Sequence, residues 1–481
     1  MKNRFSIFSF LFCLATGITN AQFTSLKSFT NDAQPMGALT LSDGMLYGMA
    51  SDGGTHNYGY IFSINRNGSN FTTLWNFNDT GVALHANGSN PNGSLTLFGN
   101  KFYGMTFYGG PSHNGNIFSI NKDGSGYKDL WDFDGGGDTN GKWGIGSLIV
   151  VGKKLYGMTE LGGTQSEGNI FCIDTNGSNY KNLWNFDNGG DTNGSRPFGD
   201  LTLSPSGTVL YGMTNQGGTN SYGNIFSIDT NGSHYKNLLS FGSSGTTNGS
   251  STYGSLTLSA SGTILYGMSI YGGTHSDGNV FSIQTNGSNY KDLLDFSGTD
   301  GEYPHGTLTL IGNTLYGTTA QGGVSDSGNI FSIDTNGTNY RNIFSFNGTN
   351  GQYPETGDLT ISGDTIFGMT LNGGTNYSGT IYSFIDNSIP LATTELPAHT
   401  NKFDLYPNPN NGAVTISIKN YESGITDQIS VYNMLGEVVY NTNLTQSISN
   451  FSLPNPVPGI YLYRILDKTG NIQGTGKFIV G

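Results

Sequence analysis

Two aspartates, Asp200 and Asp358, occupy one position of a segment that recurs along the chain. This position follows the first glycine of a GSLTL-like run, and in the other copies it holds Ala38, Ser94, Ser147, Ser255 and Thr307. Two carboxylates that face one pocket could serve as acid and base in the hydrolysis of a glycosidic bond. If the copies form a ring, however, the two aspartates lie nearly opposite each other, too far apart to flank one bond. We therefore favour a non-catalytic protein and keep a polysaccharide-acting hydrolase as the alternative.

A second set of oxygen-bearing residues could hold calcium. Two neighbouring Gly-rich segments share a D-x3-D-x-N spacing, formed by Asp134, Asp138 and Asn140 and by Asp187, Asp191 and Asn193. Carboxylate and amide oxygens suit a hard cation, but the spacing is not that of an EF-hand. Turns in which Asp or Asn precedes Gly explain the same residues equally well. Structural calcium is thus possible, and no other cofactor is expected.

Five aromatic residues are the candidate ligand-binding set. They lie in the segments just before the GSLTL-like runs of later copies: Trp143, Phe198, Tyr253, Tyr303 and Tyr353. An exposed aromatic ring offers a flat apolar surface to a sugar ring or to an apolar side chain of a partner protein. The alternative is that these rings only fill the space between neighbouring repeats. Burial separates the two interpretations, because a binding surface must leave the rings accessible.

The elements that position these residues are seven copies of one repeat. The aromatic residue of the LYGMT-like run recurs from Tyr47 to Phe367 at steps of between 50 and 56 residues. Each copy contains four short runs of strand character separated by turn signals, a pattern typical of a β-propeller. Hairpins with Asn-Gly or Asp-Gly join the third and fourth runs.

The fourth run is displaced in a way that predicts a closed ring. It follows the third run in six copies, and its seventh copy, residues 23–29, precedes the first repeat instead. We therefore expect residues 23–29 to pair with 380–384 and complete the last blade. The predicted fold is all-β, a seven-bladed β-propeller closed by its N-terminal strand. Antiparallel order places the second-to-third loops and the links between blades on one face, here called face X. The Asn-Gly hairpins lie on the opposite face, called face Y.

Residues 22–385 resemble the GloVer tandem repeat of exported bacterial proteins. The resemblance rests on LTL, LYGxTxxGG, GxxFxI and a closing LxxF run, with GNIF here in place of GTVF and Met often in place of Thr. It implies a repeat fold and no defined activity.

The two ends of the chain carry transport signals. Residues 1–21 have a basic start and a short apolar run, as in a secretory signal peptide. After the propeller at 22–386 and a linker at 387–400, residues 401–481 read as a small Ig-like β-sandwich. This last segment closely resembles the type A sorting domain of cargo of the type IX secretion system of Bacteroidetes, through Tyr406-Pro407-Asn408-Pro409, Tyr432–Gly436 and Gly459-Ile460-Tyr461. The resemblance implies the type IX machinery as a partner and a secreted or surface-attached product.

Charge and hydropathy exclude several other partners. The net charge is −13 with only 20 Lys and Arg residues, and the acidic residues are scattered. A nucleic-acid or anionic-membrane partner would require clustered basic residues. After the leader, no segment approaches the length of a transmembrane span. The sequence therefore predicts an exported binding protein for a glycan or a surface protein.

Overall fold

The computed structural model of this 481-residue chain describes most of the sequence in twelve stretches. They are residues 22–30, 33–78, 87–134, 140–187, 193–242, 248–354, 358–389, 403–418, 427–433, 438–454, 456–466 and 472–481. The predicted signal peptide and residues 390–400 of the predicted linker lie outside them. The chain divides into two units, Met1–Ile389 and Pro390–Gly481. The secondary structure of the described residues is built from β-strands, without α-helices.

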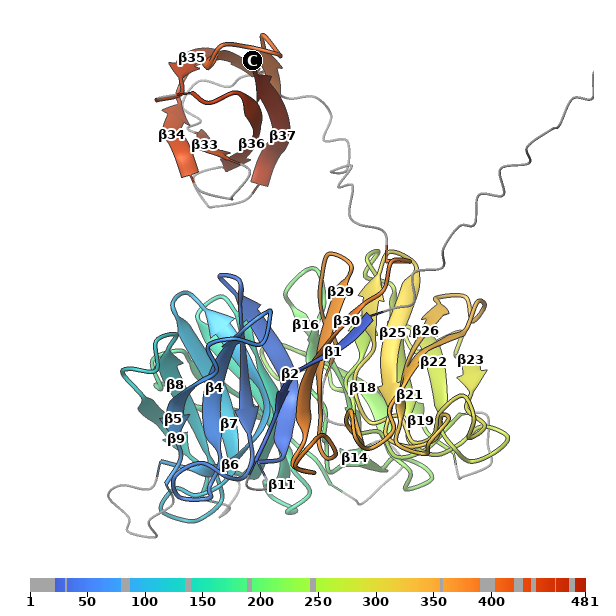
Figure 1. The fold of residues 1–481 in the computed structure, drawn as a ribbon. Coiled ribbons are helices and arrows are strands. Elements are labelled where there is room, and N and C mark those ends of the chain that lie inside the picture. The colour runs from blue at the N-terminus through green and yellow to red at the C-terminus, as the bar shows by residue number, and fades with distance from the viewer. Residues whose placement is uncertain are drawn as a thin grey trace, which may run out of the picture. The chain divides into compact units, whose positions relative to one another are not determined.

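The first unit contains seven four-stranded antiparallel sheets, which we number as blades 1 to 7 (Figure 1). Blade 1 contains β2 (Pro35–Ser42), β3 (Met45–Ala50), β4 (Tyr60–Asn65) and β5 (Thr72–Asn76). Blade 2 contains β6 (Ser89–Phe98), β7 (Lys101–Tyr108), β8 (Asn116–Asn121) and β9 (Lys128–Asp132). Blade 3 contains β10 (Gly141–Val151), β11 (Lys154–Gly162), β12 (Asn169–Asp174) and β13 (Lys181–Asn185).

The first strand is shorter in the later blades. Blade 4 contains β15 (Thr202–Leu203), β16 (Val209–Thr214), β18 (Asn224–Asp229) and β19 (Lys236–Ser240), with an extra pair of β14 (Gly194–Ser195) and β17 (Gln216–Gly217). Blade 5 contains β20 (Thr257–Leu258), β21 (Ile264–Ser269), β22 (Asn279–Gln284) and β23 (Lys291–Asp295). Blade 6 contains β24 (Thr309–Ile311), β25 (Thr314–Thr319), β26 (Asn329–Asp334) and β27 (Arg341–Ser345). Blade 7 contains β28 (Thr360–Ser362), β29 (Thr365–Thr370), β30 (Thr380–Ile385) and β1 (Gln22–Ser28).

The predicted pairing of residues 23–29 with 380–384 is confirmed. Strand β1 pairs antiparallel with β30, with Phe23 opposite Phe384 and Ser28 opposite Thr380. Blade 7 in turn meets blade 1, because the Thr360 hydroxyl donates a hydrogen bond to the carbonyl of Leu39. The N-terminal strand and the last strand of the repeats are thus joined, and the chain enters and leaves this unit at face Y, the upper end of the unit in Figure 1.

The core of the first unit lies within and between the blades. In blade 1 the glycine of the LYGM run, Gly48, lies against the ring of Phe62 on the next strand, where a Cβ would approach the ring to 2.5 Å. Between blades, stacked rings fill the space: Trp131 and Tyr180 have centroids 4.3 Å apart, and Trp184 and Tyr235 4.2 Å. Fourth-strand tryptophans therefore already supply bulky filler between these blades.

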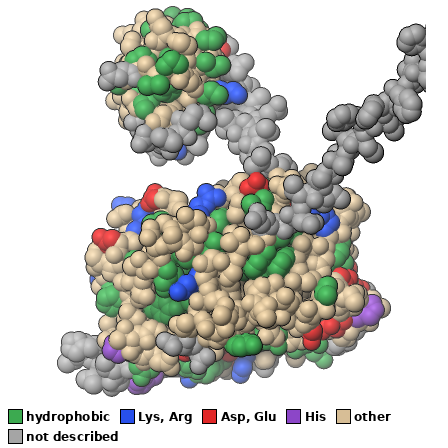
Figure 2. Space-filling model, viewed as in Figure 1, with side chains coloured by type: hydrophobic (Ala, Val, Ile, Leu, Met, Phe, Trp, Pro, Cys, Tyr) green, Lys and Arg blue, Asp and Glu red, His purple; other side chains and the backbone are tan. Residues whose placement is uncertain are grey.

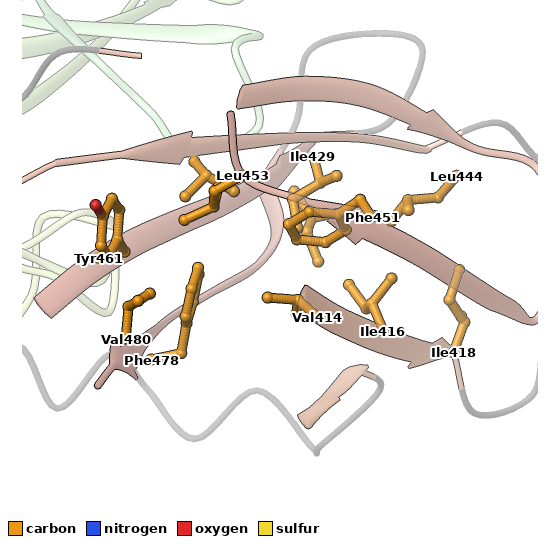
Figure 3. Close-up of a cluster of buried hydrophobic side chains, with 12 residues drawn as sticks. Val414, Ile416, Ile418, Ile429, Leu444, Phe451, Leu453, Tyr461, Phe478 and Val480 are labelled. Carbon is orange, nitrogen blue, oxygen red and sulfur yellow. The ribbon is translucent and has the colours of Figure 1, made fainter. Parts of the chain in front are cut away.

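The second unit consists of two sheets that share one apolar core. The first sheet has the order β31 (Phe403–Tyr406), β32 (Ala413–Ile418) and β35 (Ile448–Ser452). The second has the order β34 (Val438–Leu444), β33 (Asp427–Tyr432), β36 (Gly459–Leu466) and β37 (Ile472–Val480). Figure 3 shows the alternate residues Val414, Ile416 and Ile418 of β32 in a cluster with Ile429 and Phe478. The strict alternation of buried residues in β32 is the pattern of a strand with one face on a core.

The surface agrees with the composition. Figure 2 shows a side that is mostly uncharged, with Lys and Arg side chains scattered rather than gathered in one patch. Within the described ranges, there is no helix with the length and apolarity that crossing a bilayer requires.

Candidate functional site

A ring of hydrogen bonds joins the first strands of successive blades. At the position after the glycine, the backbone N–H donates to the side-chain oxygen of the equivalent residue one blade on. The bonds run from Ala38 to Ser94 (2.8 Å), from Ser94 to Ser147 (2.9 Å), from Ser147 to Asp200 (2.5 Å), from Asp200 to Ser255 (2.6 Å) and from Ser255 to Thr307 (2.9 Å). The N–H of Thr307 donates in the same way to the Asp358 carboxyl. The link from Asp358 to blade 1 has no side-chain acceptor, because residue 38 is alanine.

The glycines of this ring allow the backbones to come close together. In Gly93, φ is +87°, and a Cβ would lie 2.1 Å from the carbonyl oxygen of Gly146 on the next blade. No other residue type fits that space. The recurring Gly at this position therefore serves the close approach of neighbouring first strands.

A central cavity of about 340 Å³ lies on this ring at the face-X end. Its outer wall, toward face X, is formed by the residues just before the ring glycines, and its floor by the ring residues. The outer wall contains Met36, Asn92, Ile145, Phe198, Tyr253 and His305, and Leu371 joins it from blade 7. The floor includes Ser94, Ser147, Asp200, Ser255, Thr307 and Asp358. This size falls at the lower end of the range for small-molecule sites.

The two carboxyls in the cavity affect each other. Burial raises the pKa of Asp358 to about 7, and the negative charge of Asp200 adds to the increase. Burial also raises the pKa of Asp200, against the lowering effect of the hydrogen bonds from Ser147. Asp200, just before β15, and Asp358, just before β28, thus share one cavity, although they come from blades 4 and 7.

The five predicted aromatic residues divide into two groups. Phe198 and Tyr253 line the cavity. Trp143, Tyr303 and Tyr353 have positive φ angles of 53–61°, and their N–H groups bond to the second-to-third loop of the preceding blade. The sequence groups the five residues together, but in the structure they do not occupy equivalent positions. The cause is their different distance from the ring glycine: Phe198 and Tyr253 lie one residue before it, Trp143 and Tyr303 three, and Tyr353 four.

The cavity aromatics form a continuous row of rings. Phe198 lies against Tyr253 with centroids 4.4 Å apart, and Tyr253 lies against His305 at 5.1 Å. Tyr253 remains 39 % exposed. Burial lowers the pKa of His305 to about 4, so this ring is neutral at pH 7. His305, Met36 and Leu371 were not in the predicted site; the position of His305 before a ring glycine was the signal that could have identified it.

Trp143 belongs to a separate aromatic cluster on face X. Its ring stacks on Phe107 at 5.1 Å and meets the edge of Tyr108 at 6.0 Å, and the Lys142 ammonium lies 4.3 Å from its centroid. Tyr303 similarly meets Tyr271, with centroids 5.6 Å apart. Trp143, Tyr303 and Tyr353 are half-buried, between the two alternatives of filler and open surface.

Exposed apolar side chains of the first unit gather on face X. Among the described residues they are Tyr58, Tyr108, Tyr222, Tyr253, Tyr271, Val324 and Tyr377 on face X, and Phe98 on face Y. Tyrosine offers a large rigid contact surface with a polar end, and it is enriched in binding sites for that reason. Face X is thus the richer of the two faces in potential contact residues.

The calcium candidates lie partly outside the described residues, since Asp138 and Asp191 are not described. Of the others, the Asn140 side chain accepts a hydrogen bond from the Trp131 indole at 3.1 Å, and its carbonyl accepts one from Gly163 at 3.0 Å. The Asn193 carbonyl makes the equivalent bond to Gly218, at 2.8 Å. Asp134 is exposed and Asp187 half-buried. Among the described residues, there is no group of three His, Cys, Asp or Glu side chains that could hold a metal ion.

Cys172 is a buried free thiol in β12. It packs with Tyr156 and Leu210 in the core between blades 3 and 4, and burial raises the pKa of its thiol. These surroundings are those of a structural residue, since a nucleophilic thiol needs a lowered pKa.

Comparison with known families gives two matches. The model described as the Gloeobacter/Verrucomicrobia repeat matches residues 83–264 and 243–394. The model described as a secretion system C-terminal sorting domain matches residues 404–481. The sorting domain indicates export through type IX secretion to the cell surface or the medium. No curated protein sequence matches the chain.

Solved structures with a similar arrangement include enzymes and a surface component. PorZ, a surface component of the type IX secretion system of Porphyromonas gingivalis, is 14 % identical with a TM-score of 0.47, and the match covers 92 % of this chain and 58 % of PorZ. An oligogalacturonate lyase in complex with manganese is 11 % identical with a TM-score of 0.48, over 77 % of this chain and 94 % of the lyase. A puromycin-hydrolyzing peptidase of Mycobacterium tuberculosis is 11 % identical with a TM-score of 0.49, over 82 % of this chain and 60 % of the peptidase. Likeness at this level is too weak to transfer an activity.

Proposed function

Because this chain belongs to the Gloeobacter/Verrucomicrobia repeat family and ends in a type IX sorting domain, we propose that it is an exported, non-catalytic glycan-binding protein. Its first unit is in this proposal a seven-bladed β-propeller, and its second an Ig-like sandwich. The proposed boundaries are a signal peptide at 1–21, the propeller at 22–386, a linker at 387–400 and the sorting domain at 401–481.

The observation that carries the proposal is the aromatic row in the central cavity. Phe198 and Tyr253 present ring surfaces beside polar groups of the floor, and Tyr253 is accessible. Sugar rings have apolar CH faces that pack on aromatic rings and hydroxyls that bond to polar groups. A cavity with an aromatic wall and a hydroxyl- and carboxyl-bearing floor suits both.

The topology supports the choice of face X. Gln22 pairs with Ile385 at face Y, so the chain enters and leaves the first unit on the side away from the cavity. A tether to the sorting domain, or to the cell surface, therefore leaves from face Y. The central cavity and the exposed tyrosines lie on the opposite face of the first unit, face X.

A glycan array tests the proposal. The purified protein should bind a subset of immobilised saccharides and should release no reducing ends from them. A protein that binds no saccharide, and instead binds a surface protein, would contradict the glycan assignment.

The second candidate, a polysaccharide-acting hydrolase, is favoured by one observation. Asp358, with a pKa near 7, shares a cavity with a second carboxyl, and carboxyls of different pKa can divide the roles of acid and base. Against this, both aspartates already accept backbone N–H groups at a position where other blades have Ser or Thr. Release of reducing ends that disappears in Asp358→Asn would establish the hydrolase and overturn the non-catalytic proposal.

A further inference from the structure

The charge of the central cavity is one-sided. Its lining residues, all within the described ranges, include two carboxyls and neither Lys nor Arg. His305 is the remaining basic group in the wall, and it is neutral at pH 7 because burial lowers its pKa to about 4. The described lining of the cavity therefore contains no cationic side chain that balances Asp200 and Asp358.

The two carboxyls lie where one positive group could interact with both. Asp200 and Asp358 line the same cavity, and the negative charge of Asp200 contributes to the raised pKa of Asp358. The Asp200 carboxyl accepts hydrogen bonds from Ser147 and also lines the cavity. A cation between the two groups would replace their repulsion by attraction.

The aromatic row lies directly beside these carboxyls. Phe198 and Asp200 are separated by one residue, Gly199, and all three line the cavity. The row continues through Tyr253 to His305 across blades 4 to 6. Aromatic faces attract both the CH face of a sugar and a cationic group. A sugar ring packed on this wall would bring a substituent to the level of the carboxyls.

A bare metal ion fits this cavity less well. Calcium takes six to eight oxygen ligands at about 2.3–2.6 Å. Here the wall also contains Met36, Ile145 and Leu371, which offer no ligand to such an ion. The mixture of apolar wall and acidic floor is that of a site for an organic cation.

We infer that the central cavity binds amino sugars whose nitrogen carries a positive charge, in preference to neutral or N-acetylated sugars. This inference rests on the proposed glycan binding and specifies the class of sugar. The amine would lie between Asp200 and Asp358, with the sugar ring against Phe198 and Tyr253.

The test compares two oligosaccharides that differ only at nitrogen. Calorimetric titration of the full chain uses the glucosamine tetrasaccharide and its fully N-acetylated form. The amine form should bind at least about tenfold more tightly, the effect of one charge-assisted interaction. The double variant Asp200→Ser, Asp358→Thr keeps an oxygen for each backbone N–H, as in blades 3 and 6, and removes both charges. It should reduce the preference to within about twofold.

The possible contrary results distinguish failure of this inference from failure of the proposed function. Equal or tighter binding of the N-acetylated form, or a preference that survives in the double variant, overturns the inference. If neither tetrasaccharide binds while neutral glycans bind in a Tyr253-dependent manner, the inference fails and the proposed function stands. Tighter binding of N-α-acetyl-lysine methylamide than of any saccharide indicates a protein ligand and overturns both. Thermal unfolding of the double variant at the wild-type temperature shows that the fold is kept.

Discussion

The backbone N–H of Ser147 donates a 2.5 Å hydrogen bond to Oδ1 of Asp200, a residue on the next blade. Ser255 and Thr307 accept the equivalent N–H with hydroxyls. The Asp200 carboxyl thus has a structural task that does not require its charge. In blades 4 and 7 an aspartate makes the hydrogen bond that Ser or Thr makes in other blades. Its negative charge is an additional feature, and it faces the central cavity.

The first prediction separates the effect of the Asp200 hydrogen bond from the effect of its charge. Asp200→Ala removes the acceptor and leaves the Ser147 N–H without its partner. The free energy of unfolding should therefore fall by about 1–3 kcal/mol. Asp200→Ser keeps an acceptor and should retain near wild-type stability. Urea denaturation of both variants measures this. Equal losses in the two would show that the charge, and not the hydrogen bond, stabilises the ring.

The second prediction concerns the missing link at Ala38. A hydroxyl at this position could accept the N–H of Asp358, as Ser and Thr do in other blades. Ala38→Ser should therefore stabilise the first unit by about 0.5–1.5 kcal/mol. A lower denaturation midpoint in this variant would show that the gap between blades 7 and 1 is not equivalent to the others.

The third prediction tests the close approach of the first strands. Gly93→Ala adds a Cβ 2.1 Å from the Gly146 carbonyl in a residue with φ of +87°. Gly99, in the turn after β6, has φ of +63° and open space around it. Gly99→Ala should lower the free energy of unfolding by about 1–2 kcal/mol, because alanine is strained in the left-handed conformation. Gly93→Ala should lower it clearly more, because the added Cβ also meets the Gly146 carbonyl. Similar costs would mean that the ring can widen without penalty.

Much of the fold follows from the sequence, and the reasons are local. Seven copies of each strand-like run gave the seven sheets, and the displaced copy at 23–29 gave the pairing of β1 with β30. Strands of this kind are set by alternation and turn residues, which a single sequence contains.

The arrangement of the candidate site was less predictable. Trp143 and Tyr303 lie three residues before their ring glycines and Phe198 and Tyr253 only one, and the left-handed conformation at the earlier position turns the chain between the two. The interaction of Asp200 with Asp358 spans 158 positions and depends on the closed ring, so no local pattern contains it. By contrast, Asp129 and Asp132 lie three residues apart in one strand, so their proximity could have been predicted from the repeated i, i+3 spacing.

That pair gives the fourth prediction, on pH. Burial and the charge of Asp129 raise the pKa of Asp132 to about 7. The unfolded chain releases this proton near pH 4, so the folded state loses stability as pH rises from about 4 to 7 and remains penalised above pH 7. In blade 3 the same positions are Asn182 and Asn185, joined by a 2.7 Å hydrogen bond.

Asp132→Asn should therefore raise stability at pH 8 by about 1–3 kcal/mol and change it little at pH 4. Denaturation curves at both pH values measure the difference. Asp123→Asn, in an exposed hairpin where the Ser125 hydrogen bonds lower the pKa of the carboxyl, is the control and should not stabilise at pH 8. A constant effect of Asp132→Asn at both pH values would contradict the assignment of the proton.

The fifth prediction concerns export. The sorting domain carries the transport signal, and the first unit has a core of its own. Deletion of residues 401–481 should leave a folded first unit that stays in the periplasm, as measured by cell fractionation and limited proteolysis. Delivery of the truncated protein to the surface at the normal level would show that the signal lies elsewhere.

The most direct test of glycan binding through face X compares two aromatic residues of matched exposure. Tyr253 is 39 % exposed in the cavity, and Phe98 is 38 % exposed on face Y. Calorimetry with the tightest-binding saccharide should show a loss of about 1–3 kcal/mol in binding for Tyr253→Ala and no change for Phe98→Ala, with both variants folded. Unchanged affinity in Tyr253→Ala, or an equal loss in Phe98→Ala, would contradict binding through the central cavity.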